Sequence, residues 1–429
     1  MSIQQLSSDP TVATSLAILH KLAGFCQPRD FAVRLWEGTT WEPDAGQPAR
    51  FTLVLQHPGA LRKMLLRASN LGMGEAYIYD DYDVEGDMQA FIEFLRRLQS
   101  QKRSLGERLR LGAALLRLPS TSRPRPVNRA AQLSGGKHSL ERDKQAISYH
   151  YDLSNEFFAL FLDPYMQYTC AYYHSADEDV DVAQERKLDY ICKKLRLKPG
   201  ERLMDFGCGW GGLVLYAAQN YGVEAHGVTL SRQQAEWAQE HIRKAGLEGR
   251  CRVEFRDYRE LDAPESYDKV TAVCMIEHVG EAMMPTFFRA AWRLLRPGGV
   301  FYNQCITLNA GTAVPRKPFS LSYVFPDGEL RPISTILRHA EEADFEIRDV
   351  EGLREHYVLA LQHWLQRLES RHAELVKLTD ETTYRIFRVY LARAAYSYRV
   401  RDLNLYQTLF AKPDRGDAQL PLTRADWYA

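Results

Sequence analysis

Three glycines stand close together in residues 202–211, which read R-L-M-D-F-G-C-G-W-G. The apolar first half of this stretch predicts a buried parallel strand, and residues 213–221 have helical spacing. Helix N-terminal amides and a bare backbone can approach a polar ligand closely, so the pattern favours a nucleotide-type site, although it also fits an ordinary tight turn. The glycines of this turn are Gly207, Gly209 and Gly211.

Further polar groups follow the next apolar runs. Because the connections are short and runs alternate with helical spacing, we expect a parallel sheet with helices on both faces. Ligands bind such sheets at the carboxyl ends of the strands. The expected strands are 224–228, 252–255, 267–275 and 300–306, and the polar groups lie at 229–234 (T-L-S-R-Q-Q), 256–258 (R-D-Y) and 276–278 (I-E-H).

This order of elements resembles the S-adenosylmethionine (SAM) dependent methyltransferase version of the doubly wound fold. The turn R-P-G-G at 296–299 supports that version. A dinucleotide dehydrogenase would carry an acid after the second strand, where this chain has hydroxyls and amides. The expected fold class is α/β, a class I SAM-dependent methyltransferase with a doubly wound, mostly parallel seven-stranded sheet and a small α+β N-terminal domain.

The composition is that of a folded protein, with 429 residues, 45% hydrophobic and 26% charged. The 55 basic and 55 acidic residues cancel, which argues against a nucleic-acid partner. No run approaches the roughly 20 apolar residues of a membrane span, and the N-terminus lacks a secretory apolar region, so we expect a cytoplasmic protein. Seven cysteines without a C-x-x-C pair predict free thiols and no metal site.

Three regions are expected along the chain. Residues 1–117 form a small domain, with a hairpin between the runs at 31–36 and 51–56. Residues 118–139 are rich in proline, glycine, serine and arginine and predict a flexible linker. Residues 140–429 form the catalytic domain with a helical lid.

A basic amphipathic stretch ends the small domain. From 91 to 118, leucines and phenylalanines recur at helical spacing between arginines and lysines. Such a helix can lie on an anionic bilayer, and it can equally pack inside a domain with its charged face in water. The two readings carry about equal weight.

Several longer motifs make the chain similar to the cyclopropane-fatty-acid synthases and mycolic-acid methyltransferases, which alkylate a lipid double bond with SAM. The similarity runs from about residue 50 to 412. The motifs are H-Y-D-L-S-N-E-F-F (150–158), Y-T-C-A-Y-Y (168–173), D-F-G-C-G-W-G (205–211), G-V-T-L-S-R-Q-Q (227–234), I-E-H-V-G (276–280), R-P-G-G (296–299), F-P-D-G-E-L (325–330), E-H-Y (355–357) and N-L-Y-Q-T-L-F-A-K (404–412).

The resemblance implies a bound bicarbonate ion that takes the proton lost after alkylation. A base is needed because an alkylated alkene becomes a carbocation that must lose a proton in a dry pocket. Each implied holder also has an ordinary structural explanation, such as an ion pair for Glu277 or helix packing for Tyr357. The implied holders are Cys170, Glu277, Gln304, the backbone of Ile306, and Tyr357.

The chain departs from the family pattern at two positions. Gln304 stands where a histidine is usual, and a glutamine can donate to an anion but carries no charge and relays no proton. Ala394 stands where many members have a cysteine. The glutamine leaves bicarbonate affinity and the product open, because a cyclopropane and a methyl or methylene branch share the same first step.

The resemblance also implies the cofactor contacts, which lie at the ends of the expected strands. Tyr258 is expected beside the adenine, although Asp257 could instead reach the adenine amino group, and His278 is more naturally a structural helix residue than a base. The expected SAM-binding residues are Tyr168, Thr169, Asp205, Gly207, Gly209, Gly211, Thr229, Leu230, Gln234 and Tyr258.

The first hypothesis is therefore a C-methyltransferase acting on unsaturated acyl chains of membrane phospholipids. It would lie peripherally on the inner membrane, and a homodimer stays open. One alternative is an N-methyltransferase of a small amine, since plant alkaloid enzymes look similar around SAM. Another, motivated by Gln304 and Ala394, is a non-catalytic protein that binds SAM or lipid.

Overall fold

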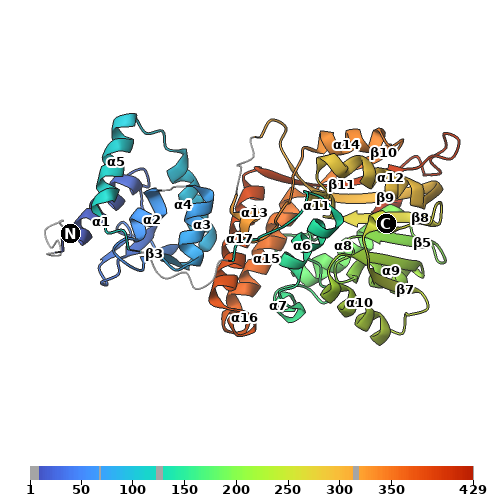
Figure 1. Ribbon diagram of the computed structural model, residues 1–429, viewed down its shortest axis with the longest axis horizontal. Coiled ribbons are helices and arrows are strands. Elements are labelled where there is room, and N and C mark those ends of the chain that lie inside the picture. The colour runs from blue at the N-terminus through green and yellow to red at the C-terminus, as the bar shows by residue number, and fades with distance from the viewer. Residues whose placement is uncertain (1–8, 67–68, 122–128, 313–317, 429) are drawn as a thin grey trace. The chain divides into compact units, whose positions relative to one another are not determined.

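The computed structural model describes residues 9–66, 69–121, 129–312 and 318–428 (Figure 1). The chain divides into two compact units. The first consists of Met1–Ala130 with Arg316–Val324 and Asp380–Tyr396, and the second of Ala131–Pro315, Phe325–Thr379 and Ser397–Ala429. Two segments from the C-terminal half thus belong to the first unit, a grouping that sequence order did not indicate. Part of the predicted linker, residues 122–128, lies outside the described residues.

The first unit contains a four-stranded sheet with the order β2-β1-β3-β4. Its strands are β1 (Phe31–Arg34), β2 (Thr40–Trp41), β3 (Phe51–Leu55) and β4 (Tyr82–Gly86). The predicted hairpin between the first and third of these is wrong, because β1 and β3 pair in parallel. The connection between them is long enough to form β2, which pairs with β1 in antiparallel fashion and leaves the other edge of β1 for β3.

The stretch predicted as one amphipathic helix forms two helices, α4 (Met88–Ser100) and α5 (Leu105–Arg117). Helix α4 buries Phe91, Ile92 and Leu98, so it is mainly a packing helix. Helix α5 buries only Leu115 and begins with a capping box. The remaining helices of this unit are α1 (Pro10–Ala23), α2 (Ala60–Leu66), α3 (Asn70–Ile78), α13 (Phe319–Tyr323) and most of α17 (Glu381–Arg399).

Two buried arginines explain why α17 belongs to the first unit. Arg385 donates to the carbonyl of Tyr77 (3.0 Å) and pairs with Asp83 (2.9 Å). Arg388 donates to the carbonyls of Val84 (2.8 Å) and Gly86 (3.2 Å). These guanidinium groups satisfy backbone acceptors along β4 that burial would otherwise leave without partners.

The second unit contains a seven-stranded sheet with the order β10-β11-β9-β8-β5-β6-β7. Strands β5 to β9 are parallel, and β11 runs antiparallel to both β9 and β10. This confirms the predicted doubly wound, mostly parallel fold. The strands are β5 (Arg202–Phe206), β6 (Glu224–Thr229), β7 (Cys251–Phe255), β8 (Tyr267–Val273), β9 (Leu295–Leu308), β10 (Glu346–Gly352) and β11 (Leu403–Ala411).

Helices cover both faces of this sheet (Figure 1). One apolar core lies between the sheet and α8, α9 and α10, and a second core lies against α12 and α14. The helices are α6 (Leu140–Tyr151), α7 (Asn155–Ala159), α8 (Val180–Leu195), α9 (Gly212–Tyr221), α10 (Arg232–Lys244), α11 (Ile276–Val279), α12 (Met284–Leu294), α14 (Ile333–Glu341), α15 (Arg354–Ser370) and α16 (His372–Leu378), with short 3-10 turns η1 (Tyr258–Glu260), η2 (Glu281–Met283) and η3 (Ala425–Trp427).

The predicted strands β5 to β9 are all present, but β8 ends at Val273 rather than at residue 275, and β9 begins earlier than predicted. The R-P-G-G segment, predicted as a turn before the strand, lies within the bounds of β9. The pairing register with β8 shifts there, between Tyr267 and Lys269, and Gly298 has a φ of +76°. The strand therefore passes through an irregularity that glycine tolerates before it continues into the core.

All seven cysteines are free thiols, as predicted. Across the described ranges, no group of three His, Cys, Asp or Glu side chains could hold a metal ion. A search of the same residues found no helix with the length and apolar character needed to cross a bilayer.

Candidate cofactor and catalytic site

The glycine turn follows β5 and leads into α9. Gly207 has a φ of +69° and Gly211 a φ of +78°, a region that side chains other than glycine rarely adopt. A Cβ on Gly207 would lie 2.8 Å from Met275, and one on Gly211 would lie 2.9 Å from Ala238. The turn is therefore both left-handed and closely packed, and its backbone forms the floor of a site at the carboxyl ends of the strands.

The H-Y-D-L-S-N segment is bound to this end of the sheet. Asp152 accepts a hydrogen bond from Ser231 (2.6 Å), at the start of α10. Asn155 accepts one from the indole of Trp210 (2.8 Å), inside the glycine turn. Thus the segment between α6 and α7 lies over the place predicted for the cofactor, and its polar residues fix it there.

Thr229 and Gln234, both predicted SAM contacts, are joined to each other. The Thr229 hydroxyl donates to Gln234 Oε1 (2.8 Å), and both side chains are buried. Asp205, in β5, accepts a hydrogen bond from Thr271 (2.7 Å). Burial raises the pKa of Asp205 to about 7, against the opposing effects of this hydrogen bond and of Lys187.

The two residues considered for the adenine have other partners. Asp257 pairs with Arg259, with Oδ2 2.6 Å from its guanidinium. The ring of Tyr258 lies in the core, 5.3 Å from the ring of Phe206 and 5.7 Å from that of Phe287, and only 5% of it is exposed. Asp257 therefore holds the loop after β7, and Tyr258 contributes mainly apolar packing beneath it.

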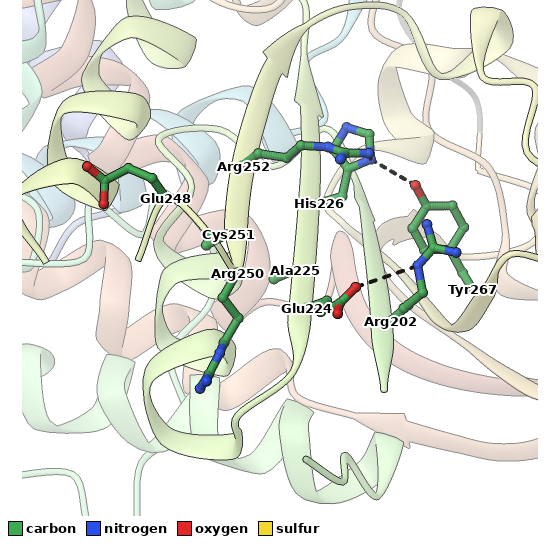
Figure 2. Close-up of a pocket in the computed structure, with 10 residues that line it drawn as sticks. Arg202, Glu224, Ala225, His226, Glu248, Arg250, Cys251, Arg252 and Tyr267 are labelled. Carbon is green, nitrogen blue, oxygen red and sulfur yellow. Dashed lines mark hydrogen bonds and ion pairs between the residues drawn. The ribbon is translucent and has the colours of Figure 1, made fainter. Parts of the chain in front are cut away.

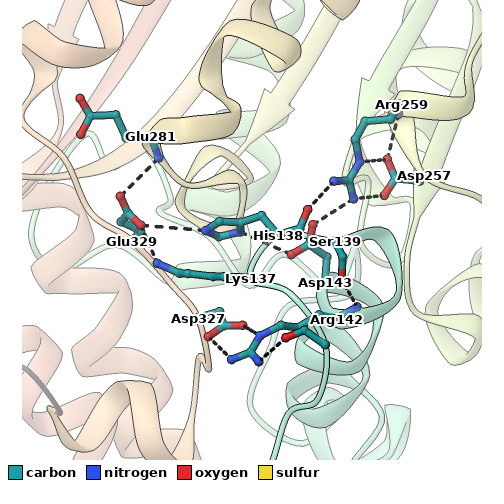
Figure 3. A network of polar contacts seen from close by, with 11 residues as sticks. Lys137, His138, Ser139, Arg142, Asp143, Asp257, Arg259, Glu281, Asp327 and Glu329 are labelled. Atoms are coloured by element: carbon teal, nitrogen blue, oxygen red, sulfur yellow. Dashed lines mark hydrogen bonds and ion pairs between the residues drawn. The ribbon is translucent and has the colours of Figure 1, made fainter.

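A polar network ties α6 and the residues before it to the turn after β7 and to the loop at 325–330 (Figure 3). His138, 9% exposed, lies between Asp143 (3.4 Å) and Glu329 (3.9 Å). Asp143 also pairs with Arg259 (2.9 Å), and Glu329 pairs with Lys137 (2.8 Å). This network joins residues 137–143 to the F-P-D-G-E-L loop, so it fixes the position of the segment that lies over the cofactor site.

Glu277 follows β8 and faces the carboxyl end of β9. Its Oε1 accepts the backbone N–H of Ile306 (2.5 Å), whereas its Oε2 is buried and has no hydrogen-bond partner among the described residues. Burial raises the pKa of Glu277 to about 7, although the bond from Ile306 opposes this shift. A buried carboxylate oxygen without a donor is costly, so this atom marks a place for a ligand that donates a hydrogen bond.

The backbone beside Glu277 is also unusual. Cys274 has a φ of +52°, which is strained for a residue with a side chain. The carbonyl of Glu277 accepts the N–H of Glu329 (2.8 Å), which brings the F-P-D-G-E-L loop to this point. The position of Glu277 is thus determined from β9, from its own strained turn and from the loop.

Gln304 lies in β9, fully buried. Its Oε1 accepts hydrogen bonds from Tyr302 (3.3 Å) and Gln407 (3.2 Å), and its Nε2 donates to the sulfur of Cys274 (3.6 Å). These bonds fix which end of the amide faces Cys274 and leave one N–H of the Nε2 group for another acceptor. Gln304 is therefore oriented as a donor toward the Glu277 side of the strand ends.

Cys170 and Tyr357 meet at one backbone carbonyl. The Cys170 thiol donates weakly to the carbonyl of Leu353 (3.8 Å), which also accepts the N–H of Tyr357 (3.2 Å). Burial raises the pKa of Cys170, so it is a neutral thiol. Leu353 also donates its own N–H to the carbonyl of Leu405 (3.0 Å), and Leu405 pairs with Ile306 across β11 and β9.

The five predicted bicarbonate holders thus form two linked groups. Glu277, Ile306 and Gln304 lie around the start of the turn after β8. Cys170 and Tyr357 are linked to this group through Leu353 and Leu405, the β11 partner of Ile306. Sequence reasoning missed several polar residues that hold this site. They are Asp152, Asn155, Asp163, Gln184, Lys187 and Ser231. Asp152, Asn155 and Ser231 lie in quoted motifs, and a single sequence offers no signal that would single out the other three.

The surroundings of His278 agree with its interpretation as a structural helix residue rather than a base. Burial lowers its pKa to about 4, so the imidazole is neutral, and its ring packs near Tyr151 and Phe325.

A hollow of about 100 Å³ elsewhere in this unit lies at the amino ends of β5 to β8 (Figure 2). Its lining residues include the first residues of these strands, Arg202, Glu224, Cys251 and Tyr267. The hollow therefore lies at the amino ends of the strands, whereas the cofactor site lies at their carboxyl ends.

The residues present fit SAM and a small anion. The left-handed glycine turn offers bare backbone, Thr169 offers a hydroxyl, and Glu277 Oε2 offers an acceptor without a donor. The acceptor suits the O–H of a bicarbonate ion, and the Gln304 amide suits its negatively charged oxygens.

Comparisons with known proteins show which family the chain belongs to. The family described as "Mycolic acid cyclopropane synthetase" matches residues 138–408, and a domain of unknown function matches residues 19–105. The chain is 36% identical over 402 residues to a "Probable fatty acid methyltransferase" of Pseudomonas putida, covering 92% of this chain and 95% of that protein. It is 35% identical over 353 residues to the "Cyclopropane-fatty-acyl-phospholipid synthase" of Escherichia coli K12, covering 82% and 85%.

A solved structure of a cyclopropane synthase is also similar to this chain. The mycolic acid cyclopropane synthase CmaA1, complexed with S-adenosylhomocysteine (SAH) and CTAB, superposes with a TM-score of 0.58 at 30% identity, covering 62% of this chain and 97% of that one. The matched family covers more than half of the chain, and it includes every predicted site residue. The chain therefore belongs to the mycolic acid cyclopropane synthetase family and is a SAM-dependent methyltransferase of the fatty acid methyltransferase type.

Proposed function

We propose that this enzyme transfers the SAM methyl group to a double bond in an acyl chain of a membrane phospholipid. The bond between sulfur and methyl breaks as a bond from the methyl carbon to an alkene carbon forms, and the resulting cation loses a proton to give a cyclopropane, a methylene branch or a methyl-branched alkene. The names of the relatives from P. putida and E. coli support an acyl substrate.

The observation that carries this proposal is the geometry of Glu277. Bound SAM supplies the electrophilic methyl group, and a bound bicarbonate supplies the base. Glu277 holds Ile306 with one oxygen and presents the other, buried and without a donor, toward the position of the anion. Gln304, Cys170 and Tyr357 supply the remaining walls, which exclude water from the reacting carbon.

The methyl acceptor separates this proposal from the two alternatives. With methyl-labelled SAM, phosphatidylglycerol vesicles whose chains are monounsaturated should take up label, and vesicles with saturated chains should not. A small amine in the same mixture should stay unlabelled. Label in the amine would favour the N-methyltransferase alternative, and SAM binding without label in any acceptor would favour the non-catalytic one.

We further propose that α5 places the first unit on the membrane surface. Leu105, Leu109 and Leu116 are 75%, 67% and 57% exposed. Their spacing of four and seven residues puts them on one face of the helix. Arg108, Arg110 and Arg117 are exposed around this face. An apolar stripe bordered by cations is complementary to an anionic bilayer, so residues 1–117 are proposed as the lipid-binding domain.

Two variants test α5 separately for charge and apolar contact. Changing Arg108, Arg110 and Arg117 to Gln should weaken binding to phosphatidylglycerol vesicles about 100-fold at low salt, at about 1 kcal/mol per charge, and little at high salt. Changing the three leucines to Ser should weaken binding at both salt concentrations. Serine at the exposed Val182, Val350 and Leu422 of the second unit is the matched control. Unchanged sedimentation with vesicles in both variants would exclude α5 as the membrane contact.

A further inference from the structure

Lys187, in α8, is a fully buried cation that the catalytic scheme does not use. Its side chain has 0% exposure. The ammonium donates to Gln167 Oε1 (2.5 Å) and to Thr169 Oγ1 (3.0 Å), and within the described residues no carboxylate lies within 4 Å of it. Lys194, two turns further along the same helix and 1% exposed, instead pairs with Asp349 (3.2 Å) and Glu351 (2.5 Å).

The acids nearest to Lys187 are satisfied by other donors. Asp163 accepts the backbone N–H groups of Tyr165 (2.9 Å) and Gln167 (2.8 Å), and Asp205 accepts the Thr271 hydroxyl. Burial lowers the pKa of Lys187 to about 8, and the charges of Asp163 and Asp205 oppose this shift. At neutral pH, Lys187 is therefore mostly protonated and lacks a close counter-ion, which is costly unless a ligand supplies one.

The loop that receives these bonds lies against the glycine turn. Gln184, one turn before Lys187, donates to the carbonyls of Gln167 (3.3 Å) and Thr169 (2.8 Å). A Cβ on Gly212, the first residue of α9, would lie only 2.2 Å from the carbonyl of Tyr165. Helix α8 therefore fixes Thr169 at the start of α9, beside the predicted cofactor.

The bond between Lys187 and Thr169 sets the direction of a hydroxyl. An ammonium group has only donors, so Thr169 Oγ1 must accept from it. The hydroxyl hydrogen of Thr169 then points away from Lys187 and can donate to a further acceptor. A cation behind a hydroxyl strengthens it as a donor, most of all toward an anion.

We propose that Lys187 is a positioning residue that directs the Thr169 hydroxyl to the carboxylate of the cofactor's methionine moiety. This inference rests on the SAM-dependent reaction proposed above and adds the residue that selects the amino-acid end of the cofactor. The carboxylate is the only negatively charged group of SAM, whereas its sulfonium and α-ammonium groups are positive and its adenosine is neutral. A buried cation therefore favours the first of these groups and leaves adenosine recognition to the glycine turn.

Two ligands separate this role from a general effect on folding. SAH carries the carboxylate, and 5′-methylthioadenosine carries the same adenosine and thioether without the amino-acid end. In Lys187→Met, the dissociation constant of SAH measured by calorimetry should rise about 10- to 100-fold, as expected for loss of a hydrogen bond to a charged group, and that of 5′-methylthioadenosine by less than about 3-fold. Lys194→Met is the matched control, and it should leave the ratio of the two constants unchanged.

Thr169 provides a second test if Lys187→Met folds poorly. Thr169→Val should reproduce the loss for SAH alone, Thr169→Ser should restore binding, and the double variant Lys187→Met/Thr169→Val should lose little more than either single variant. Equal weakening of both ligands, or no weakening, would overturn the role of Lys187. Failure of the wild-type protein to bind SAH or SAM would instead count against the proposed reaction itself.

Discussion

Glu277→Gln should lower kcat about 10³-fold while the dissociation constant of SAM changes by less than about 2-fold. The Ile306 N–H needs an acceptor, so the new amide will turn its oxygen toward Ile306. Its NH₂ group then occupies the position of Glu277 Oε2, which is buried and without a donor. The O–H of a bound bicarbonate would then face an N–H donor instead of an acceptor, and no carboxylate would remain to accept its proton.

The pH dependence of kcat tests the catalytic role of Glu277 independently. Because burial raises the pKa of Glu277 to about 7, its ionised fraction grows with pH, and kcat should rise between about pH 6 and 8 and then level off. Burial also raises the pKa of Asp205 to about 7, so the pH profile of the residual Glu277→Gln activity decides which carboxyl group causes the rise in kcat. If the rise is absent from this variant, it belongs to Glu277. Glu355→Gln, whose side chain is 70% exposed, is the control. A Glu277→Gln enzyme within about 3-fold of wild type would remove Glu277 from the mechanism.

Gln304→Ala should cost about 10- to 100-fold in kcat, the equivalent of one hydrogen bond to a charged acceptor, roughly 1.5 to 3 kcal/mol. Added bicarbonate should partly restore the rate, because the variant binds the anion weakly. Gln304→His should keep activity, since it supplies the same donor. Gln304→Glu has the same shape but a negative charge, so it should lose more activity than Gln304→Ala and gain nothing from bicarbonate.

The partner of Gln304 supplies the matched control. Gln407→Leu removes a bond to Gln304 Oε1 and leaves the Gln304 N–H groups in place, so its loss should be only a few-fold. The products of each variant are then separated by gas chromatography. A changed ratio of cyclopropane to branched chains in Gln304→His, at the same total transfer, would mean that the glutamine determines the product. Gln304→Ala with the rate and products of wild type would exclude both roles.

The sequence predicted the second unit well because its signals are local. Short apolar runs followed by glycines or polar turns mark β5 to β8, and alternation with helices determines a parallel sheet. The fold of the first unit was harder to predict. The pairing of β1 with β3 in parallel depends on a long connection that also forms β2. Helix α17 joins this unit through Arg385 and Arg388, which lie 302 and 304 residues from their partners Asp83 and Val84 in β4.

The candidate site was likewise only partly predictable from the sequence. Glu277 and the glycines could be located because they follow strands directly. Lys187 could not, since a lysine in an amphipathic helix normally faces water, and only the packing of α8 against the 165–170 loop reveals that it is buried. The orientation of Gln304 depends on Gln407, which comes from β11, a strand distant in sequence.

The most direct measurement of the central claim is mass spectrometry of phospholipids from cells that express the wild-type protein or Glu277→Gln. Wild-type cells should contain monounsaturated acyl chains heavier by one CH₂ group, and with deuterated methyl SAM a cyclopropane or methylene product should lose one deuterium of the transferred methyl. Cells with Glu277→Gln should contain almost none of these chains. Phospholipids of unchanged acyl mass in wild-type cells, at full expression and with SAM binding intact, would contradict the assignment of the acyl double bond as the methyl acceptor.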